Sequence, residues 1–314
     1  MQIREARSRD VLGPWNAWRP EFFKTAARLD DADRGGTIFA PDVGVHEDIH
    51  ELDFASLYPN IIRTRNISPE TVRCGCCDND SVPGIGYSIC EEDGYPPDVL
   101  GPLIDARSDI KKQINETENK NERESLEAAS SAIKWVPISC FGYQGFSNAK
   151  FGRVECHEAI NAFAREILLD AKAALEEGGW RVVHGIVDSI WVTPAEGSDQ
   201  RDLETIAAEV SEDIGVELEY KCAFDWVAFC PMRNSESGAL TCYFGKHRGV
   251  FVPEPEAELG NVIKTRGIEG RQRSTPAWVE NVQVDALRVF EKPDPQRPCV
   301  TCFAGTSWSY ARET

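Results

Sequence analysis

The feature that most constrains the fold is a long amphipathic helix followed at once by two short strands. Apolar residues recur at helical spacing over residues 157–177, and two consecutive glycines end the pattern. Residues 180–183 and 186–192 are predicted as two strands around a turn at His184–Gly185, which is typical of a β-hairpin. A helix that leads into a hairpin favours an α+β fold with an antiparallel sheet.

Another candidate strand lies much earlier in the chain and ends at an aspartate. Residues 47–54 alternate well enough for a strand that delivers Asp53 to a sheet edge, and Pro59 is expected to break regular structure after it. Asp188 follows the predicted hairpin bend. Paired carboxylates on adjacent strands can hold two divalent ions for phosphoryl transfer. A lone aspartate at a strand end is more often a turn or capping residue, so the pair alone leaves both interpretations open.

The chain between these strands changes character twice. Residues 74–97 are rich in Gly, Pro, Asp and Cys, which predicts an irregular insertion. Apolar spacing then predicts a helix over residues 103–119 and a second one from about residue 125 to a break near Pro137. These two helices would form a helical hairpin.

The charge of the chain bears on its partners. The net charge is −18, from 34 basic and 52 acidic residues, and this argues at first against a nucleic-acid partner. The basic residues comprise 23 arginines and only 11 lysines, a composition typical of a halophilic protein. At about 1 M salt the Debye length falls to ~3 Å, which screens repulsion from DNA phosphates. Residues 246–273 hold six basic against four acidic residues and are the best candidate for DNA contact. The six are Lys246, Arg248, Lys264, Arg266, Arg271 and Arg273.

Eleven cysteines favour reduced thiols or metal ligands over a disulfide framework, because their number is odd. Four of them form the pattern C-x-C-C-x12-C, a candidate zinc site with a non-standard spacing, for which a disulfide cross-link and unliganded thiols are equal alternatives. These four are Cys74, Cys76, Cys77 and Cys90. Five single cysteines are predicted as small core residues, namely Cys140, Cys156, Cys222, Cys230 and Cys242. The Cys299–Cys302 pair has no second pair nearby and is assigned no role.

The string DFASLYPNII at residues 53–62, with NISPETV at 66–72, resembles the first palm motif of family B DNA polymerases. The chain is most similar to the divergent second archaeal paralogue of that family. The resemblance implies that Asp53 binds metal and that Tyr58 stacks under the sugar of the incoming nucleotide and excludes a 2′-hydroxyl. Without it, Tyr58 would be predicted as a core aromatic. The nucleotide-binding residues implied by this motif are Phe54, Ser56, Leu57 and Tyr58.

Two further strings resemble motifs of the family, but each differs from its motif at one position that bears on function. The segment that ends in AIKWVPISCFGYQGF at 132–146 is similar to the fingers helices, where cationic side chains would grip the triphosphate and Phe141 would pack against the base pair. These cationic residues are Arg107, Lys111 and Lys134. Ile138 replaces a polar residue of this motif. In the third motif, HGIVDS at 184–189, Ile186 replaces the first aspartate, whereas Asp188 keeps the second.

The strings KHRGVF at 246–251 and KTRGIEGRQR at 264–273 resemble the start of the thumb, which holds the backbone of primer–template DNA. The resemblance implies a right-hand architecture with an antiparallel-sheet palm, helical-hairpin fingers and a short thumb. We assign residues 1–65 to an N-terminal segment and the first part of the palm, 66–140 to the fingers with the Cys-rich insertion, 141–240 to the palm, and 241–314 to a truncated thumb.

The implied activity is template-directed extension of a DNA primer with deoxynucleoside triphosphates, in replication or repair. Asp53 and Asp188 would hold two Mg²⁺ or Mn²⁺ ions. The region before Asp53 is too short for an exonuclease domain, so proofreading is expected either to come from a separate exonuclease or replication accessory protein or to be absent. Ile138 and Ile186 keep open a weak or inactive DNA-binding or assembly subunit, and a nucleotidyltransferase that needs no template is a third hypothesis. No stretch has the apolar length of a spanning helix, so we expect a cytoplasmic protein without a membrane partner.

Overall fold

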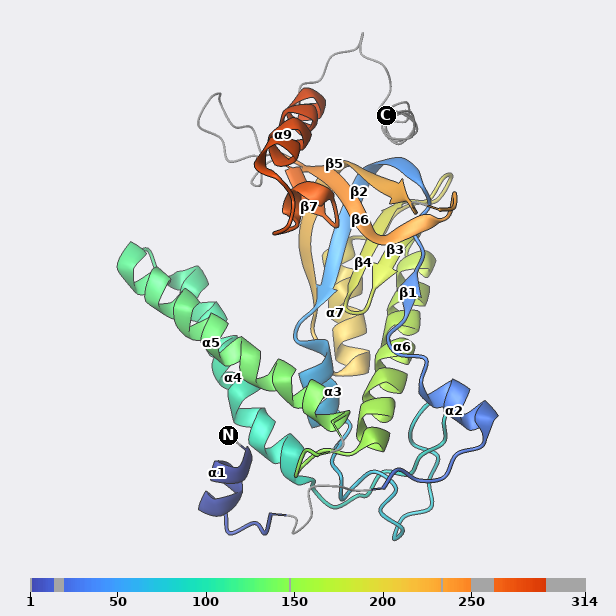
Figure 1. The fold of residues 1–314 in the computed structure, drawn as a ribbon, viewed down its shortest axis with the longest axis vertical. Coiled ribbons are helices and arrows are strands. Elements are labelled where there is room, and N and C mark those ends of the chain that lie inside the picture. The colour runs from blue at the N-terminus through green and yellow to red at the C-terminus, as the bar shows by residue number, and fades with distance from the viewer. Residues whose placement is uncertain (1, 14–19, 147, 233, 250–262, 292–314) are drawn as a thin grey trace. The chain divides into compact units, whose positions relative to one another are not determined.

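The computed structural model describes residues 2–13, 20–146, 148–232, 234–249 and 263–291, drawn as coloured ribbon in Figure 1. The chain divides into two compact units. Unit 1 consists of residues 1–37, 54–170 and 211–217, and unit 2 consists of residues 38–53, 171–210 and 218–314. Helices and one antiparallel sheet occur together, so the predicted α+β class is confirmed.

Unit 2 is built on a seven-stranded sheet with the order β1-β3-β4-β2-β5-β6-β7. The registered pairs β1–β3, β3–β4, β2–β4, β5–β6 and β6–β7 are all antiparallel. The strands are β1 (Ile38–Phe39), β2 (Gly44–Phe54), β3 (Trp180–Ile186), β4 (Ser189–Pro194), β5 (Leu218–Pro231), β6 (Gly238–His247) and β7 (Ile263–Arg266). The predicted strand at 47–54 is thereby confirmed as the last eight residues of β2, in the interior of the sheet.

The core of unit 2 is aromatic and lies along the central strands. Its buried members are Ile49, Val183, Trp191, Phe224, Val227, Phe229 and Tyr243. Burial of each large apolar side chain contributes about 1.5–3 kcal/mol to folding. A smaller cluster of Ile263 and Leu287, packed with Phe244 and Ile268, attaches η1 (Glu269–Arg271) and α9 (Ala277–Glu291) to strands β6 and β7.

Unit 1 is mainly helical. Its helices are α1 (Gln2–Ser8), α2 (Ala26–Ala32), α3 (Leu57–Thr64), α4 (Tyr95–Glu116) and α5 (Lys120–Gln144). Helices α4 and α5 lie side by side, which confirms the predicted helical hairpin (Figure 1). Two helices belong to both units, α6 (Val154–Glu177), which confirms the prediction for 157–177, and α7 (Leu203–Ile214).

Prolines misled the prediction of helix bounds. Pro59 was expected to break regular structure, but it is the third residue of α3, where its missing N–H would have had no intrahelical acceptor. The predicted break near Pro137 was also wrong, because α5 continues to Gln144 with Pro137 buried inside it. Helix α4 begins eight residues earlier than expected, with prolines in its first turn.

The hairpin turn lies at Val187–Asp188, and the expected turn at His184–Gly185 was wrong. His184 is buried within β3, where its Nδ1 donates a hydrogen bond to the Phe39 carbonyl oxygen at 2.8 Å. A Cβ on Gly185 would collide with the Phe39 ring, so this glycine permits close packing of β1 on β3 and does not make a turn. Val187 instead takes the positive φ of the turn, 57°.

The remaining expectations have mixed outcomes. Residues 74–94 contain no helix and one residue of a β-bridge, Ile89, which confirms the irregular insertion as far as residue 94. Residues 95–97, which were also expected to be irregular, belong to α4. A separate C-terminal unit was expected to begin near residue 241, but this residue lies inside β6, so the sheet continues across that point. The division into palm, fingers and thumb stays a prediction. Of the five single cysteines, Cys140 and Cys156 are buried and the others are half-buried. Residues 250–262 and the Cys299–Cys302 pair lie outside the described residues. Among the described helices, none has the length and apolar character needed to cross a bilayer.

Candidate functional site

Two neighbouring strands of unit 2 bring Asp53 and Asp188 to the same end of the sheet. Strands β2 and β4 pair so that Asp53 lies directly opposite Ser189, and Asp188 is the residue before Ser189, in the hairpin turn. The Asp188 amide donates to the Ile186 carbonyl oxygen at 2.7 Å, which closes the turn. Opposed residues lie about 5 Å apart and chain neighbours about 3.8 Å, so the two aspartate Cα atoms lie within about 9 Å of each other. We call Asp53, Asp188, Ser189, Glu219 and Lys221 the carboxylate edge.

The Asp53 carboxylate is held by a hydroxyl and approached by a cation. Ser189 Oγ donates to Asp53 Oδ1 at 2.7 Å, and Lys221 Nζ lies 3.9 Å from Asp53 Oδ2. Burial raises the pKa of Asp53, while the Ser189 hydrogen bond and the Lys221 charge oppose that rise. A positive charge at this edge therefore stabilises the ionised form of Asp53.

Sequence reasoning missed Lys221 and Glu219. They lie two residues apart at the start of β5, the strand beside β2 in the sheet, and form an ion pair with each other. Residues at i and i+2 of a strand share one face. The sequence shows this alternation, but it does not show that β5 lies beside β2. The proximity of Lys221 to Asp53 therefore could not be predicted.

Three of the six basic residues expected to contact DNA are engaged by acidic groups. Lys264 Nζ lies 2.7 and 2.6 Å from the two carboxylate oxygens of Glu51, whose side chain is buried. Lys246 Nζ lies 3.4 Å from Asp225 Oδ2, and Arg248 pairs with Asp48. The other three residues are exposed: Arg266, Arg271 and Arg273.

A second group of predicted residues meets within unit 1. Ser56 precedes α3 in the left-handed conformation, with φ 50°, and its Oγ accepts a hydrogen bond from Arg107 on α4. The Tyr58 and Phe141 rings stack with centroids 3.9 Å apart and planes 10° apart. Phe141 also stacks on His157 of α6 at 4.5 Å, a contact that the sequence did not suggest. We call Ser56, Tyr58, Arg107, Phe141 and His157 the Tyr58–Arg107 cluster.

The other residues expected to bind nucleotide are more dispersed. Phe54 and Leu57 are buried, so their side chains belong to the core. Lys111 lies one helical turn after Arg107 on α4, and Lys134 is exposed on α5.

A hollow of about 1060 Å³ in unit 1 has the wrong charge for a triphosphate. It lies beside the start of α4 and is lined by five carboxylates and one arginine, Arg63. The five are Glu70, Glu91, Asp93, Asp98 and Asp105. Repulsion between these carboxylates and phosphate groups disfavours direct binding of a triphosphate in the hollow.

Comparisons with known proteins define the family. The sequence model of "DNA polymerase family B" matches residues 6–218. The chain belongs to this family. DNA polymerase 2 of Saccharolobus solfataricus is 36% identical over 76% of this chain and 35% of its own length. DNA polymerase 1 of Pyrococcus abyssi is 32% identical over 92% of this chain and 35% of its own length. The chain thus spans about a third of the length of these relatives.

A solved family B DNA polymerase, from Pyrobaculum calidifontis, shares the fold. Its structure covers all of this chain and 37% of its own, with a TM-score of 0.65 and 22% identity. The resemblance to archaeal family B polymerases inferred from the motifs is therefore confirmed. The matched residues 6–218 include Asp53, Tyr58, Arg107 and Asp188 and end before β6 and β7.

Proposed function

We propose that this chain carries the polymerising site of a DNA-directed DNA polymerase, which adds deoxynucleotides to a primer 3′-hydroxyl by two-metal phosphoryl transfer. The observation that supports it is the register of β2 against β4, which sets Asp53 opposite Ser189 and next to Asp188. Family membership supports DNA as the substrate, although the chain spans only a third of its relatives.

The carboxylate edge fits the metal ions that this reaction requires. Oxygen ligands from aspartates are those that Mg²⁺ prefers. Divalent ions held by Asp53 and Asp188 would neutralise charge on the attacking and leaving oxygens. Ser189 fixes the orientation of the Asp53 carboxylate through its hydrogen bond.

The Tyr58–Arg107 cluster is proposed to bind the incoming deoxynucleotide. Arg107 offers several N–H donors to a phosphate, and its bond to Ser56 fixes where it points. Tyr58 is held flat against Phe141, so its position under a sugar would be rigid enough to exclude a 2′-hydroxyl. Lys111 and Lys134 would add charge along the triphosphate.

Contact with the DNA backbone is proposed for Arg266, Arg271 and Arg273. These arginines are exposed in unit 2. Contacts from them to DNA phosphates would not depend on the base sequence. Lys246, Arg248 and Lys264 would contribute less, because each has an acidic partner that phosphate must displace.

Primer extension in high salt, with and without template, tests the activity. We expect extension with template, Mg²⁺ or Mn²⁺ and deoxynucleotides, and none in Asp188→Ala. Asp199→Ala is the matched control, because Asp199 is an exposed carboxylate outside the carboxylate edge. Extension without template would support the nucleotidyltransferase hypothesis, and equal extension by Asp188→Ala would remove Asp188 from the site.

A second candidate is a weak or inactive DNA-binding subunit. Ile186 and Lys221 favour it, since one removes a carboxylate from the hairpin and the other adds a positive charge beside Asp53. An inert parent that regains extension as Ile186→Asp would identify a degenerate polymerase. A parent that binds primer–template DNA but never extends it, in any of these variants, would make binding its function.

A further inference from the structure

Four thiols converge in the irregular insertion of unit 1. The sulfur atoms of Cys74, Cys76, Cys77 and Cys90 all lie within 4.8 Å of one another, and none of the four is disulfide-bonded. Cys76 Sγ lies 3.5 Å from Cys90 Sγ, and Cys77 Sγ lies 3.9 Å from each of those two sulfurs. The cluster belongs to neither the carboxylate edge nor the Tyr58–Arg107 cluster.

The spacing of the sulfurs distinguishes between a metal site and a disulfide. A zinc ion with four thiolates at about 2.3 Å in a tetrahedron has sulfurs about 3.8 Å apart. The three measured separations lie within about 0.3 Å of that value. A disulfide needs about 2.05 Å, and two pairs would have to form to use all four thiols.

The backbone of the insertion is shaped to gather these thiols. Arg73 and Gly75 both have positive φ, 54° and 81°, which turns the chain sharply around Cys74. A β-bridge between Val72 and Ile89 brings the distant Cys90 back to this turn. The bridge is extended by the Cys90 amide, which donates to the Thr71 carbonyl oxygen at 2.9 Å. Cys77 and Cys90, which are 13 residues apart in the sequence, are thus brought together by main-chain hydrogen bonds.

We propose that Cys74, Cys76, Cys77 and Cys90 bind one structural zinc ion. Four protein ligands leave no open position for substrate or water, as in structural zinc sites and unlike catalytic ones. The insertion buries few apolar side chains, chiefly Val72, Val82, Tyr87 and Ile89, so a metal cross-link would supply stability that its small core does not.

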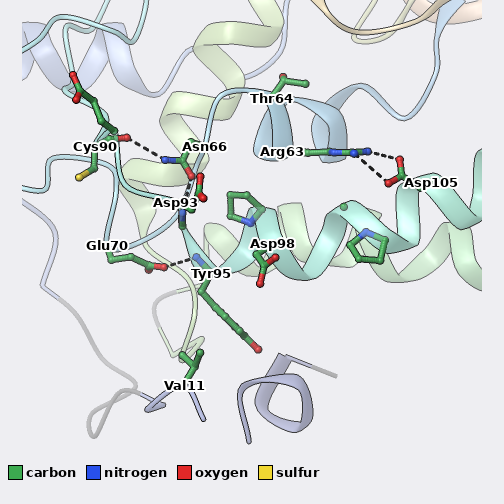
Figure 2. A pocket seen from close by; sticks show the side chains of 15 residues that line it. Val11, Arg63, Thr64, Asn66, Glu70, Cys90, Asp93, Tyr95, Asp98 and Asp105 are labelled. Atoms are coloured by element: carbon green, nitrogen blue, oxygen red, sulfur yellow. Dashed lines mark hydrogen bonds and ion pairs between the residues drawn. The ribbon is translucent and has the colours of Figure 1, made fainter. Parts of the chain in front are cut away.

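The zinc ion would also fix the start of helix α4. Asn66 Nδ2 donates to the carbonyl oxygen of Cys90 (Figure 2) and to that of Glu92. Its Oδ1 accepts from the amide of Gly94, the N-cap of α4. Glu70 accepts from the Tyr95 amide beside it (Figure 2). A rigid Cys90 therefore positions, through one asparagine, the first turn of the helix that carries Arg107.

Metal analysis of the purified full chain tests this proposal independently of any polymerase activity. We expect about one zinc per chain by mass spectrometry of the elements, lost in Cys76→Ser and in Cys90→Ser. Cys230→Ser, a half-buried cysteine of β5, is the matched control and should keep its zinc. Cys76→His should also keep zinc, because three thiolates and one imidazole form a standard structural site.

A measurement on the parent protein covers the case in which the serine variants do not fold. Removal of zinc with a chelator should increase amide hydrogen exchange over residues 66–95 and leave β2–β4 of unit 2 unchanged, and added zinc should reverse it. The proposal is overturned if the parent takes up no zinc from solution while all four thiols react with a thiol reagent. A mass lower by two hydrogens per bond would show disulfides and overturn it as well.

Discussion

At the carboxylate edge of unit 2, an isoleucine and a lysine accompany the two aspartates, whereas the Tyr58–Arg107 cluster of unit 1 holds its polar and aromatic groups in direct contact. Ile186 ends the strand before the hairpin turn, and Lys221 lies 3.9 Å from Asp53. In the cluster, Ser56 binds Arg107 and Tyr58 stacks on Phe141. We therefore expect the carboxylate edge to bind divalent ions weakly and the Tyr58–Arg107 cluster to bind the incoming nucleotide tightly.

The largest expected effect concerns the cluster. Arg107→Ala removes the cation proposed to bind the triphosphate and leaves Ser56 without its partner, so we expect KM for deoxynucleotides to rise roughly a hundredfold, about 3 kcal/mol. Steady-state primer extension measures it. Lys112→Ala, an exposed cation on the same helix, is the control and should change little. An unchanged KM in Arg107→Ala would contradict the intact cluster.

The next effect concerns the sugar. Tyr58→Ala removes the ring that Phe141 holds in place, so ribonucleotides should enter roughly ten to a hundred times more readily relative to deoxynucleotides, as expected for relief of a 1–3 kcal/mol overlap. Competition between the two nucleotides in one extension assay measures this ratio. Tyr58→Phe should discriminate as the parent does, because in this proposal the volume of the ring excludes the hydroxyl. Equal discrimination in all three proteins would remove Tyr58 from the sugar site.

A smaller effect should appear at the carboxylate edge. Lys221→Met removes a positive charge that would compete with divalent ions for Asp53. A partly exposed charge is worth about 1 kcal/mol, so the Mg²⁺ concentration at half-maximal extension should fall about fivefold. Lys172→Met, on the solvent side of α6, should not change it. A higher Mg²⁺ requirement in Lys221→Met would mean that Lys221 supports the edge and does not compete with the metal.

The smallest effect concerns the loss of stability of unit 2 in acid. Burial lowers the pKa of His184 below its usual 6.5, so the unfolded chain binds a proton first as the pH falls below about 6.5. The free energy of unfolding should therefore decrease from pH 7 to pH 5, by at most about 1.4 kcal/mol per pH unit for this group. Urea unfolding should show a shallower decrease in His184→Gln. Burial also lowers the pKa of His50 and His247, so some decrease remains.

The sequence predicted the features that depend on local periodicity or on a long motif. Helix α6 and strand β2 were found because their apolar spacing repeats over many residues, and Asp53 and Asp188 because each lies in a recognisable string. The turn was misplaced because Gly185 was taken as a turn residue, on the basis of the conformational freedom of glycine. In the structure Gly185 lies in β3, where the lack of a side chain makes room for the Phe39 ring of β1. Lys221 was missed for the same reason: its relation to Asp53 depends on which strands are neighbours.

The basic residues show a related limit. Six cations in a short window suggested a DNA-binding surface, but Lys264 is held by Glu51, which lies 213 residues away in the sequence. A count of charges cannot distinguish a cation that faces solvent from one that pairs with a buried acid. The distinction required the order of strands in the sheet.

The interleaving of the two units has a consequence for how the protein is made. The chain passes from one unit to the other after residues 37, 53, 170, 210 and 217. Asp53 and its partner Ser189 are 136 residues apart, so on a ribosome that adds about 5–20 residues per second, β2 would wait on the order of ten seconds for β4. A β-strand that lacks its neighbours for that time can pair with other chains. Nascent chains of this protein should therefore depend on chaperones more than those of a protein whose units follow one another along the sequence.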